Sequence, residues 1–386
     1  MFDLLSKEER VSYESFLEFS KLHVSANTSS WEKNEAISEE IKQLCAKEGY
    51  MGGAIPTEYG GKGWDFVTYG LFNEAIGRNS VSLSGLFNVH TMVAQTILKW
   101  GTEIQKEKWI RRMASGEIIG AFALTEPVAG SDVQGIETEY RLENDKLVLN
   151  GCKRWITFGG IADLLVVFGK IDGKPIACLV EKNTPGLTIN PVGDMLGFKA
   201  SHLAILNFEN CIIEKENIIG REGFAFQYIA PYALEFGRIS VAWAALGIVR
   251  GCLENCGQYA MDRKTFGNRL IEHGMIQTMI TEMGVDLEAS KLLCLKACKT
   301  KDNHLPKATE EIMYAKYFTT KAAVKHSANA VQILGASGCK GTSSVSRYYR
   351  DSKTMEIIEG SNQIHEMILG KSFARKGKKM ISKSII

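Results

Sequence analysis

The order of hydrophobic and polar positions divides the chain into three parts. Residues 1 to about 117 are predicted to be mainly helical, because they show no sustained two-residue alternation and the segment 38–48 begins at a plausible cap. From about 118 to 220, apolar runs of strand length occur at 146–151, 164–170, 176–181 and 203–208. Asp172 and Gly173 join the second run to the third, which predicts a hairpin. The middle part is therefore predicted to be a mainly antiparallel β-domain.

The helical period returns after Gly223. Ile276, Ile280, Met283 and Leu287 fall on one face of a predicted helix, with steps of four, three and four residues. Further helices are predicted at 226–260, 307–332 and 345–370, which is enough for a four-helix bundle. The predicted fold class is α+β, with an N-terminal helical domain at 1–117, a β-domain at 118–225 and a C-terminal helical bundle at 226–386.

Composition limits the classes of function. The 46 basic and 44 acidic residues leave a net charge of +2, without the strong positive field of a nucleic-acid-binding protein, so no nucleic-acid partner is expected. Apolar runs such as 164–168 are far shorter than the roughly 20 residues of a membrane span, so we expect no membrane partner and a cytoplasmic location. The 9 cysteines fit reduced thiols, and no metal site is predicted.

Glu359 is the strongest candidate for a chemical role. It follows Ile357 and Ile358 and precedes Gly360, so its carboxylate could be shielded from water. Loss of water raises the pKa of a carboxylate, because the charged form loses more solvation than the neutral form. A raised pKa makes the carboxylate a better proton acceptor, so Glu359 is predicted to act as a general base. The alternative is a carboxylate that caps a helix or forms an ion pair.

Four motifs occur in order along the chain, namely 124–132 (LTEPVAGSD), 155–157 (WIT), 263–267 (RKTFG) and 358–361 (IEGS). With the helix, strand, helix order of the three parts, they resemble the acyl-CoA dehydrogenase family over nearly the whole chain. The resemblance implies an FAD-dependent oxidoreductase that acts on an acyl thioester. It also implies a homodimer or homotetramer, and an electron acceptor such as an electron-transfer flavoprotein.

The resemblance also implies which residues bind FAD. The β-domain would line the flavin ring and the pyrophosphate with Phe122, Leu124, Thr125, Ser131, Trp155 and Thr157. A neighbouring subunit would reach the cofactor with Arg263, Thr265, Phe266, Gln332 and Gly335, and the adenine end would be completed by Ser361 and Gln363. Two positions depart from the family pattern: Gly274 stands where the family often has a glutamine, and Ala336 stands where a second glycine is common. These departures imply weakened or rerouted contacts to the remote half of FAD.

For the reaction, the resemblance implies that Glu359 removes a proton from Cα while the hydride on Cβ passes to flavin N5. The backbone N–H of Glu359 and a ribityl hydroxyl of the flavin would hold the thioester carbonyl, with Arg238 and Gly360 in the substrate site. Some members carry the base on an earlier helix instead, next to the arginine that corresponds to Arg238. That neighbour is Gly237 here, although Glu235 and Glu356 are other acids close to these positions.

The sequence indicates the acyl group of the substrate less closely than it indicates the reaction. Residues 236–243, 291–295 and 355–359 resemble a branch of the family that oxidises a short polar acyl group on an acyl carrier protein, on a route to hydroxymalonyl or aminomalonyl extender units for polyketides. Trp243 would shorten the acyl pocket, or simply pack in the core. The basic tail from Lys371 to Lys379 would meet an acidic carrier, or simply be solvated. The alternatives are an ordinary short-chain acyl-CoA dehydrogenase, a flavin-free acyl-binding module and an oxygen-using oxidase.

Overall fold

The computed structural model of the protein describes residues 4–384, with side chains described through residue 378. The amino-terminal part is helical, as predicted, and its helices are α1 (Lys7–Phe19), α2 (Thr28–Asn34), α3 (Glu39–Lys47), α4 (Phe66–Gly77), α5 (Val81–Trp100) and α6 (Glu103–Ala114). Ser6 and Glu9 form a capping box that fixes the start of α1. Helices α4 and α5 are apolar on most faces, and both are buried in the centre of the molecule.

The middle part is a seven-stranded sheet with the order β1-β4-β2-β3-β7-β6, and β5 pairs with β4. Its strands are β1 (Gly120–Ala123), β2 (Glu139–Glu143), β3 (Lys146–Ile156), β4 (Leu164–Ile171), β5 (Lys174–Glu181), β6 (Leu187–Pro191) and β7 (Ala204–Ile213). The predicted hairpin joins β4 to β5, and Asp172 (φ 48°) and Gly173 (φ 75°) make its left-handed turn.

Three strands, β1, β2 and β6, are absent from the prediction. Strand β1 is only four residues long, while most residues of β2 and β6 are exposed or half-buried and show no apolar alternation. Both β1 and β2 pair with β4 in parallel, whereas the remaining pairs are antiparallel. The prediction of a mainly antiparallel domain is therefore confirmed, with parallel pairing at its centre.

The carboxy-terminal part is helical and contains α7 (Ala230–Asp262), α8 (Gly274–Asp302), α9 (Ala308–Leu334), α10 (Ala336–Cys339), α11 (Ser344–Met355) and α12 (Asn362–Ser384). A hairpin of β8 (Lys264–Thr265) and β9 (Asn268–Arg269) joins α7 to α8. Met283 and Leu287 of the predicted apolar face are buried, while Ile276 and Ile280 at the start of α8 are half-buried. The α+β fold class is confirmed, and the exact domain boundaries remain predictions.

One predicted helix is wrong. The segment 345–370 is not continuous, because a loop at 356–361 separates α11 from α12. Glu359 (φ 56°) and Gly360 (φ 89°) both have left-handed backbone conformations, which end a right-handed helix. Glycine adopts this conformation without strain, but glutamate rarely does. The loop therefore holds Glu359 in a strained backbone conformation, which is a feature of functional sites.

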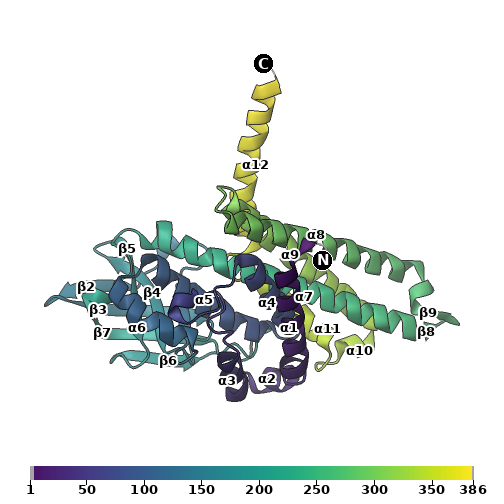
Figure 1. Cartoon of the computed structure of the whole chain (residues 1–386), viewed down its shortest axis with the longest axis horizontal. Helices are drawn as coiled ribbons and strands as arrows, with labels where there is room; N and C mark the ends of the chain where they lie inside the picture. Colours follow the sequence, from purple (N-terminus) through teal and green to yellow (C-terminus); the bar gives the residue numbers. More distant parts are fainter. Residues whose placement is uncertain (1–3, 385–386) are drawn as a thin grey trace.

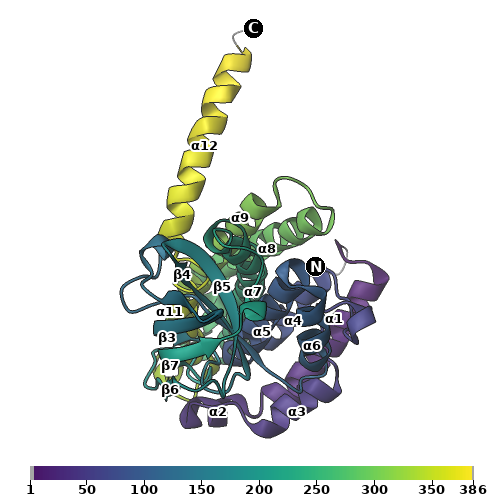
Figure 2. The same ribbon diagram turned by 90° about the vertical axis from the view of Figure 1, so that its left-hand side faces the viewer.

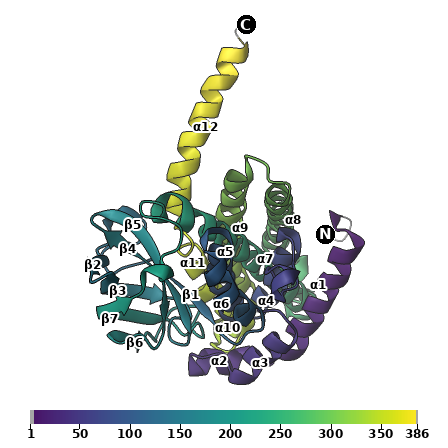
Figure 3. The ribbon, with the colours of Figure 1, turned by 60° about the vertical axis from the view of Figure 1, so that its left-hand side comes forward.

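Helix α7 organises the molecule. It runs along the long axis from the β-domain at one end to the β8–β9 hairpin at the other (Figure 1), with the sheet gathered on one side and most helices on the other (Figure 3). The segment Ala225–Asp262 is long and apolar enough to cross a membrane, but 89% of its most apolar window is buried within the protein. This burial is typical of the core helix of a globular protein.

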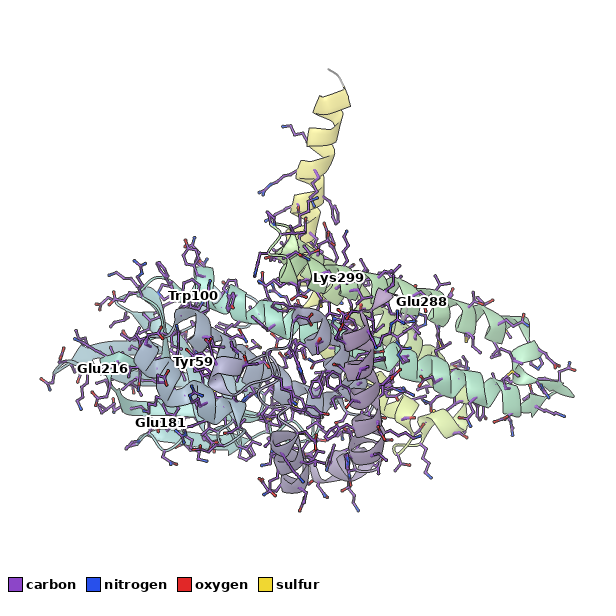
Figure 4. The ribbon with its side chains drawn as sticks, viewed as in Figure 1. Tyr59, Trp100, Glu181, Glu216, Glu288 and Lys299 are labelled. Atoms are coloured by element: carbon purple, nitrogen blue, oxygen red, sulfur yellow. The ribbon has the colours of Figure 1, made fainter. Side chains whose placement is uncertain are left out.

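The two chain ends differ in their attachment. Lys299 of α8 lies beside the amino-terminal segment, and its Nζ donates to the backbone oxygen of Leu4 at 3.1 Å (Figure 4). Helix α12 projects away from the body (Figure 2), but its middle is held to α9 where Ser372 and Lys376 bond the two carboxylate oxygens of Glu310, each at 2.5 Å. One cation of the basic tail is thus bound to the bundle, and the side chain of Lys379 lies outside the described residues.

Candidate active site

The Glu359 carboxylate lies at the meeting point of α5, α7 and the loop at 356–361. Asn88 Nδ2 on α5 donates to Glu359 Oε1 at 3.2 Å, while Oε2 is buried and has no hydrogen-bond partner among the described residues. Burial raises the pKa of the Glu359 carboxyl, and the Asn88 amide and the charges of Arg238 and Lys316 offset part of the rise. A buried carboxylate oxygen without a partner is suited to accept a proton.

Gly237 on α7 leaves the space that this carboxylate occupies. A Cβ atom added at Gly237 would lie 2.2 Å from Glu359 Oε2, far inside any acceptable contact. A base carried at position 237 and a base carried at position 359 would therefore compete for one place. The structure therefore gives a physical reason why position 237 is a glycine when position 359 is a glutamate.

Two buried cations hold the loop that carries Glu359. Arg238 Nε donates to the backbone oxygen of Glu359 at 3.2 Å. Lys316 Nζ on α9 donates to the backbone oxygens of Glu356 (3.2 Å) and Gly360 (2.9 Å) and to Asn362 Oδ1 (3.1 Å). Burial lowers the pKa of Lys316 to about 7, with Glu359 opposing the shift. Because three acceptors need three protons, we assign Lys316 as the ammonium form.

The other acids near the site are already occupied. Glu235 bonds Lys301 and Thr309, and Glu356 pairs with Lys353 at 2.7 Å. Of these three acids, only Glu359 has a buried carboxylate oxygen, Oε2, without a hydrogen-bond partner among the described residues.

A second group of predicted residues lies around the loop that follows β1. Phe122 is on β1, Leu124, Thr125 and Ser131 are on the loop, and Trp155 and Thr157 lie at the end of β3. The Arg154 N–H donates to the Thr125 backbone oxygen at 2.9 Å, so the two segments are joined directly. The structure thus brings these six predicted residues to one edge of the sheet.

A buried ion pair fixes this loop. Lys153 Nζ lies 2.6 Å from Glu126 Oε1 and donates to the Leu124 backbone oxygen at 3.1 Å, and Glu126 also accepts the N–H groups of Glu137 and Thr138. Neither Lys153 nor Glu126 is among the predicted site residues. Both are charged residues in mixed sequence, so no pattern distinguishes them from surface positions.

We expect Lys153→Met to destabilise the protein by about 3–5 kcal/mol, because it leaves the Glu126 carboxylate buried without its cation. The flavin content after purification should fall as well, since the loop at 124–131 loses its anchor. The control is Lys174→Met, whose partner Glu222 is solvent-exposed, so it should cost less than about 1 kcal/mol. Denaturant unfolding compares them, and equal midpoints for the two variants would refute the anchoring role.

The residues at this edge fit FAD. Trp155 has a left-handed backbone (φ 60°) and is 42% exposed, with the Arg154 guanidinium 4.4 Å from its ring centroid. Arg154 Nε is buried and has no hydrogen-bond partner among the described residues. An open tryptophan face beside an unpaired cation is suited to a planar cofactor that carries phosphate.

The remaining predicted FAD residues lie elsewhere. Arg263, Thr265 and Phe266 lie on or beside the β8–β9 hairpin, at the end of the molecule opposite the β-domain (Figure 1), and Phe266 is 98% exposed. Gln332 and Gly335 are at the end of α9, while Ser361 and Gln363 flank the start of α12. The residues near the hairpin are too remote to join Trp155 within one chain. Their predicted role at the cofactor of a neighbouring subunit remains a proposal.

A small cavity lies between α5 and α7, and Asn88, the hydrogen-bond partner of Glu359, is one of the residues that line it. Its volume is about 10 Å³, the space of roughly one water molecule. Trp243 is not among the residues that line it, since the indole packs on Gly70 and donates to Cys298 Sγ at 3.2 Å. The prediction that Trp243 shortens an acyl pocket is therefore not supported by its position, and the residue packs in the core.

All three domains of one family match this chain. The acyl-CoA dehydrogenase N-terminal domain matches residues 6–117, the middle domain residues 121–211 and the C-terminal domain residues 226–374. The mitochondrial short-chain specific acyl-CoA dehydrogenase of Rattus norvegicus is 39% identical over 338 residues, 86% of this chain and 81% of that protein. The acyl-CoA dehydrogenase of Bacillus subtilis (strain 168) is 37% identical over 360 residues, 92% of this chain and 94% of that protein.

Solved structures agree. Butyryl-CoA dehydrogenase from Megasphaera elsdenii superposes with a TM-score of 0.92 at 30% identity, covering 96% of this chain and 99% of that one. A glutaryl-CoA dehydrogenase from Mycobacterium smegmatis in complex with FADH2 has a TM-score of 0.92 at 27% identity, with coverages of 97% and 96%. A structure described as the electron transferring flavoprotein of Acidaminococcus fermentans gives 0.91 at 32% identity, with coverages of 96% and 99%.

Two further similar structures are described with other substrates or pathways. The prolyl acyl carrier protein oxidase AnaB has a TM-score of 0.91 at 28% identity, with coverages of 96% and 99%. FkbI, described for biosynthesis of the methoxymalonyl extender unit of a polyketide, has a TM-score of 0.85 at 26% identity, with coverages of 94% and 99%. Domain matches over most of the chain and relatives above 30% identity lead to one conclusion: this protein is an FAD-dependent oxidoreductase and belongs to the acyl-CoA dehydrogenase family.

Proposed function

We propose that the protein dehydrogenates a short acyl thioester between Cα and Cβ, with Glu359 as the general base. The observation that carries this proposal is the buried, partnerless Oε2 of Glu359 beside Gly237. The short-chain specific relatives support a short acyl group.

Each residue of the site has a role in this proposal. Glu359 Oε2 takes the proton from Cα, and the Arg238 and Lys316 cations keep its loop in place. The Glu359 N–H has no partner among the described residues and can donate to the thioester carbonyl oxygen, which stabilises the charge that develops there. When bound, FAD supplies the two-electron acceptor for the hydride that leaves Cβ.

The rate of flavin reduction should fall at low pH with an acid limb above the ordinary range of a glutamate, because burial raises the pKa of Glu359 and only the ionised form is a base. Asn88→Leu removes the hydrogen bond that stabilises the carboxylate, so it should move this limb to higher pH. The effect of pH on the free energy of unfolding has the opposite sign. The folded protein holds the Glu359 proton more tightly than the unfolded chain, so protonated Glu359 stabilises the fold at low pH and this stabilisation is lost as pH rises. A limb that stays in place or moves to lower pH in Asn88→Leu would contradict the assignment.

A second candidate differs in what carries the acyl group. AnaB favours a substrate on an acyl carrier protein, and FkbI favours a precursor of a polyketide extender unit, such as one of the hydroxymalonyl or aminomalonyl type. The short-chain relatives favour the coenzyme A thioester. Flavin bleaching by one short acyl group, presented first on coenzyme A and then on a carrier protein, separates the two. Faster bleaching by the carrier-bound form would favour the extender-unit branch.

The re-oxidation partner and the oligomer are also proposals. An electron-transfer flavoprotein is the favoured acceptor, and hydrogen peroxide formed without an added acceptor would favour an oxidase instead. The exposed Phe266 on a hairpin far from the β-domain supports a homodimer or homotetramer in which this hairpin meets another subunit's cofactor. A cytoplasmic location remains a prediction.

A further inference from the structure

His365 is a buried histidine that the proposed reaction does not use. It lies in the first turn of α12, its side chain is 0% exposed, and neither Nδ1 nor Nε2 has a hydrogen-bond partner among the described residues. Its backbone N–H donates to the oxygen of Ser361 at 3.2 Å, so it follows directly on the loop that carries Glu359. Buried polar groups without a partner are rare in folded proteins, so this imidazole requires an explanation.

The imidazole and the guanidinium of Arg238 meet beside Gly360. The position that a Cβ atom would take at Gly360 lies 3.7 Å from Arg238 Nη2 and 3.8 Å from His365 Nε2. The two nitrogens are therefore separated by no more than the sum of these distances, and His365 Nε2 has no direct hydrogen bond to any described residue. One water molecule can bridge nitrogens that are roughly 5 Å apart, because each of its hydrogen bonds is about 2.8–3.0 Å long.

His365 is neutral at physiological pH. Burial and the nearby charges of Lys316 and Arg238 lower the pKa of the imidazole to about 3. A neutral imidazole has one N–H and one lone pair. Because a guanidinium attracts a lone pair and repels an N–H, we assign the lone pair to Nε2 and the proton to Nδ1. His365 therefore presents a hydrogen-bond acceptor on the side of Arg238.

Arg238 has donors left for this acceptor. Its Nε donates to the Glu359 backbone oxygen at 3.2 Å, while Nη1 and Nη2 have no hydrogen-bond partner among the described residues. A guanidinium has five N–H groups and prefers to share two of them with one carboxylate. The direction in which Nη1 and Nη2 point thus decides whether Arg238 supports the loop or pairs with a carboxylate.

Two carboxylates act on the charge of Arg238, those of Glu359 and Glu235. Both oxygens of Glu235 are already bonded, one to Lys301 and the other to Thr309. Glu359 Oε2 is buried without a partner among the described residues, so it is open to an ion pair with the guanidinium. Such a pair would lower the pKa of the Glu359 carboxyl by about 1–3 pH units and make it a weaker base.

The other groups around Glu359 do not hold the guanidinium away from it. Asn88 on α5 directs a donor to Oε1, and Lys316 on α9 directs donors to the loop backbone. The Tyr69 phenol on α4 is close enough for the charge of Glu359 to act on it, but burial raises the pKa of this phenol and keeps it uncharged. His365 on α12 supplies the neutral acceptor beside Gly360, where the guanidinium also lies.

We infer that His365 is a positioning residue: its Nε2 lone pair holds the Arg238 guanidinium beside Gly360, through one water molecule, and keeps it off Glu359 Oε2. Arg238 can then anchor the loop through its Nε without pairing with the base. This inference rests on the proposed function, because it takes Glu359 as the base.

The protonation of Glu359 can be followed without substrate, through the infrared band of its protonated carboxyl group, identified as the band that Glu359→Gln lacks. In His365→Phe, which keeps a ring and removes both nitrogens, the midpoint of this band should lie at least about one pH unit below that of the wild-type flavoprotein. Bleaching by butyryl-coenzyme A should also be slower at its optimum pH, because the base is weaker. His365→Gln offers an amide oxygen as acceptor and should keep the wild-type midpoint.

His23→Phe is the matched control. His23 is half-buried in the amino-terminal part and packs against Phe19 with ring centroids 5.2 Å apart, so phenylalanine there should leave the midpoint unchanged. An unchanged or higher midpoint in His365→Phe would overturn the inference, as would an equal fall of the midpoint in His365→Gln. Both outcomes leave the proposed function standing, which fails instead if Glu359→Gln bleaches at the wild-type rate.

Discussion

Glu359→Gln is expected to retain FAD and to lose about a hundred- to ten-thousand-fold of the rate at which an acyl thioester bleaches the flavin. The amide has nearly the shape of the carboxylate but cannot take the Cα proton. Retention of the cofactor is expected because the predicted FAD residues at the β-domain edge are separate from the loop at 356–361, and the change leaves Ser361 in that loop unaltered. Single-turnover bleaching under anaerobic conditions measures the loss directly, without the later transfer of electrons to an acceptor.

The control for this variant is Glu366→Gln on α12. Glu366 is exposed and accepts a hydrogen bond from the Tyr317 hydroxyl at 2.9 Å, so the same change there should leave bleaching near its wild-type rate. Wild-type bleaching by Glu359→Gln would remove Glu359 from the reaction. Loss of FAD in this variant would mean that the residue supports cofactor binding instead.

Gly237→Ala is expected to lower the bleaching rate about a hundredfold. The added methyl group would lie 2.2 Å from Glu359 Oε2, so the carboxylate must move, and a displacement of about 1 Å costs roughly this factor. The loss should appear in the rate of the chemical step, with FAD content unchanged. In a Glu359→Gly background the same substitution should cost less stability than in the wild type, because the three atoms nearest to the added methyl group are gone.

Gly257→Ala is the matched control for Gly237→Ala. Gly257 lies on the same helix α7, and a Cβ added there would meet no atom within 4 Å. Alanine is the better helix former by about 0.5–1 kcal/mol, so this variant should be slightly more stable than the wild type and equally active. If Gly237→Ala behaves like Gly257→Ala, then Glu359 does not occupy the position assigned to it.

Much of the fold could be predicted because each domain repeats its pattern over many residues. The apolar periods of the helical parts and the buried runs of β4 and β5 are long enough to recognise, and the Asp-Gly turn between them has a defined geometry. Strand β2 is mostly exposed and β1 is four residues long, so neither leaves such a pattern. The pattern does not reveal the break at Glu359, because apolar residues recur at helical spacing on both sides of it.

The base was predictable and its surroundings were not. Glu359 lies in a recognisable local motif, whereas Asn88 and Lys316 reach it from α5 and α9, far away in the sequence. Lys316 shares a helix face with Ile312, Thr319 and Thr320, which are buried in the structure, but two of these three residues are threonines and form no apolar stripe in the sequence. A lysine among buried neighbours at helical spacing indicates a paired or hydrogen-bonded cation.

The most direct test of the central claim is the anaerobic bleaching of the purified flavoprotein by a short acyl thioester, unlabelled and then deuterated at Cα. Removal of the Cα proton by Glu359 predicts that the flavin band is bleached and that deuterium slows this step in the wild type. Bleaching at the same rate with both forms would show that this bond is not broken in the step. A flavin band that persists with every short acyl thioester, on coenzyme A or on a carrier protein, would contradict the account as a whole.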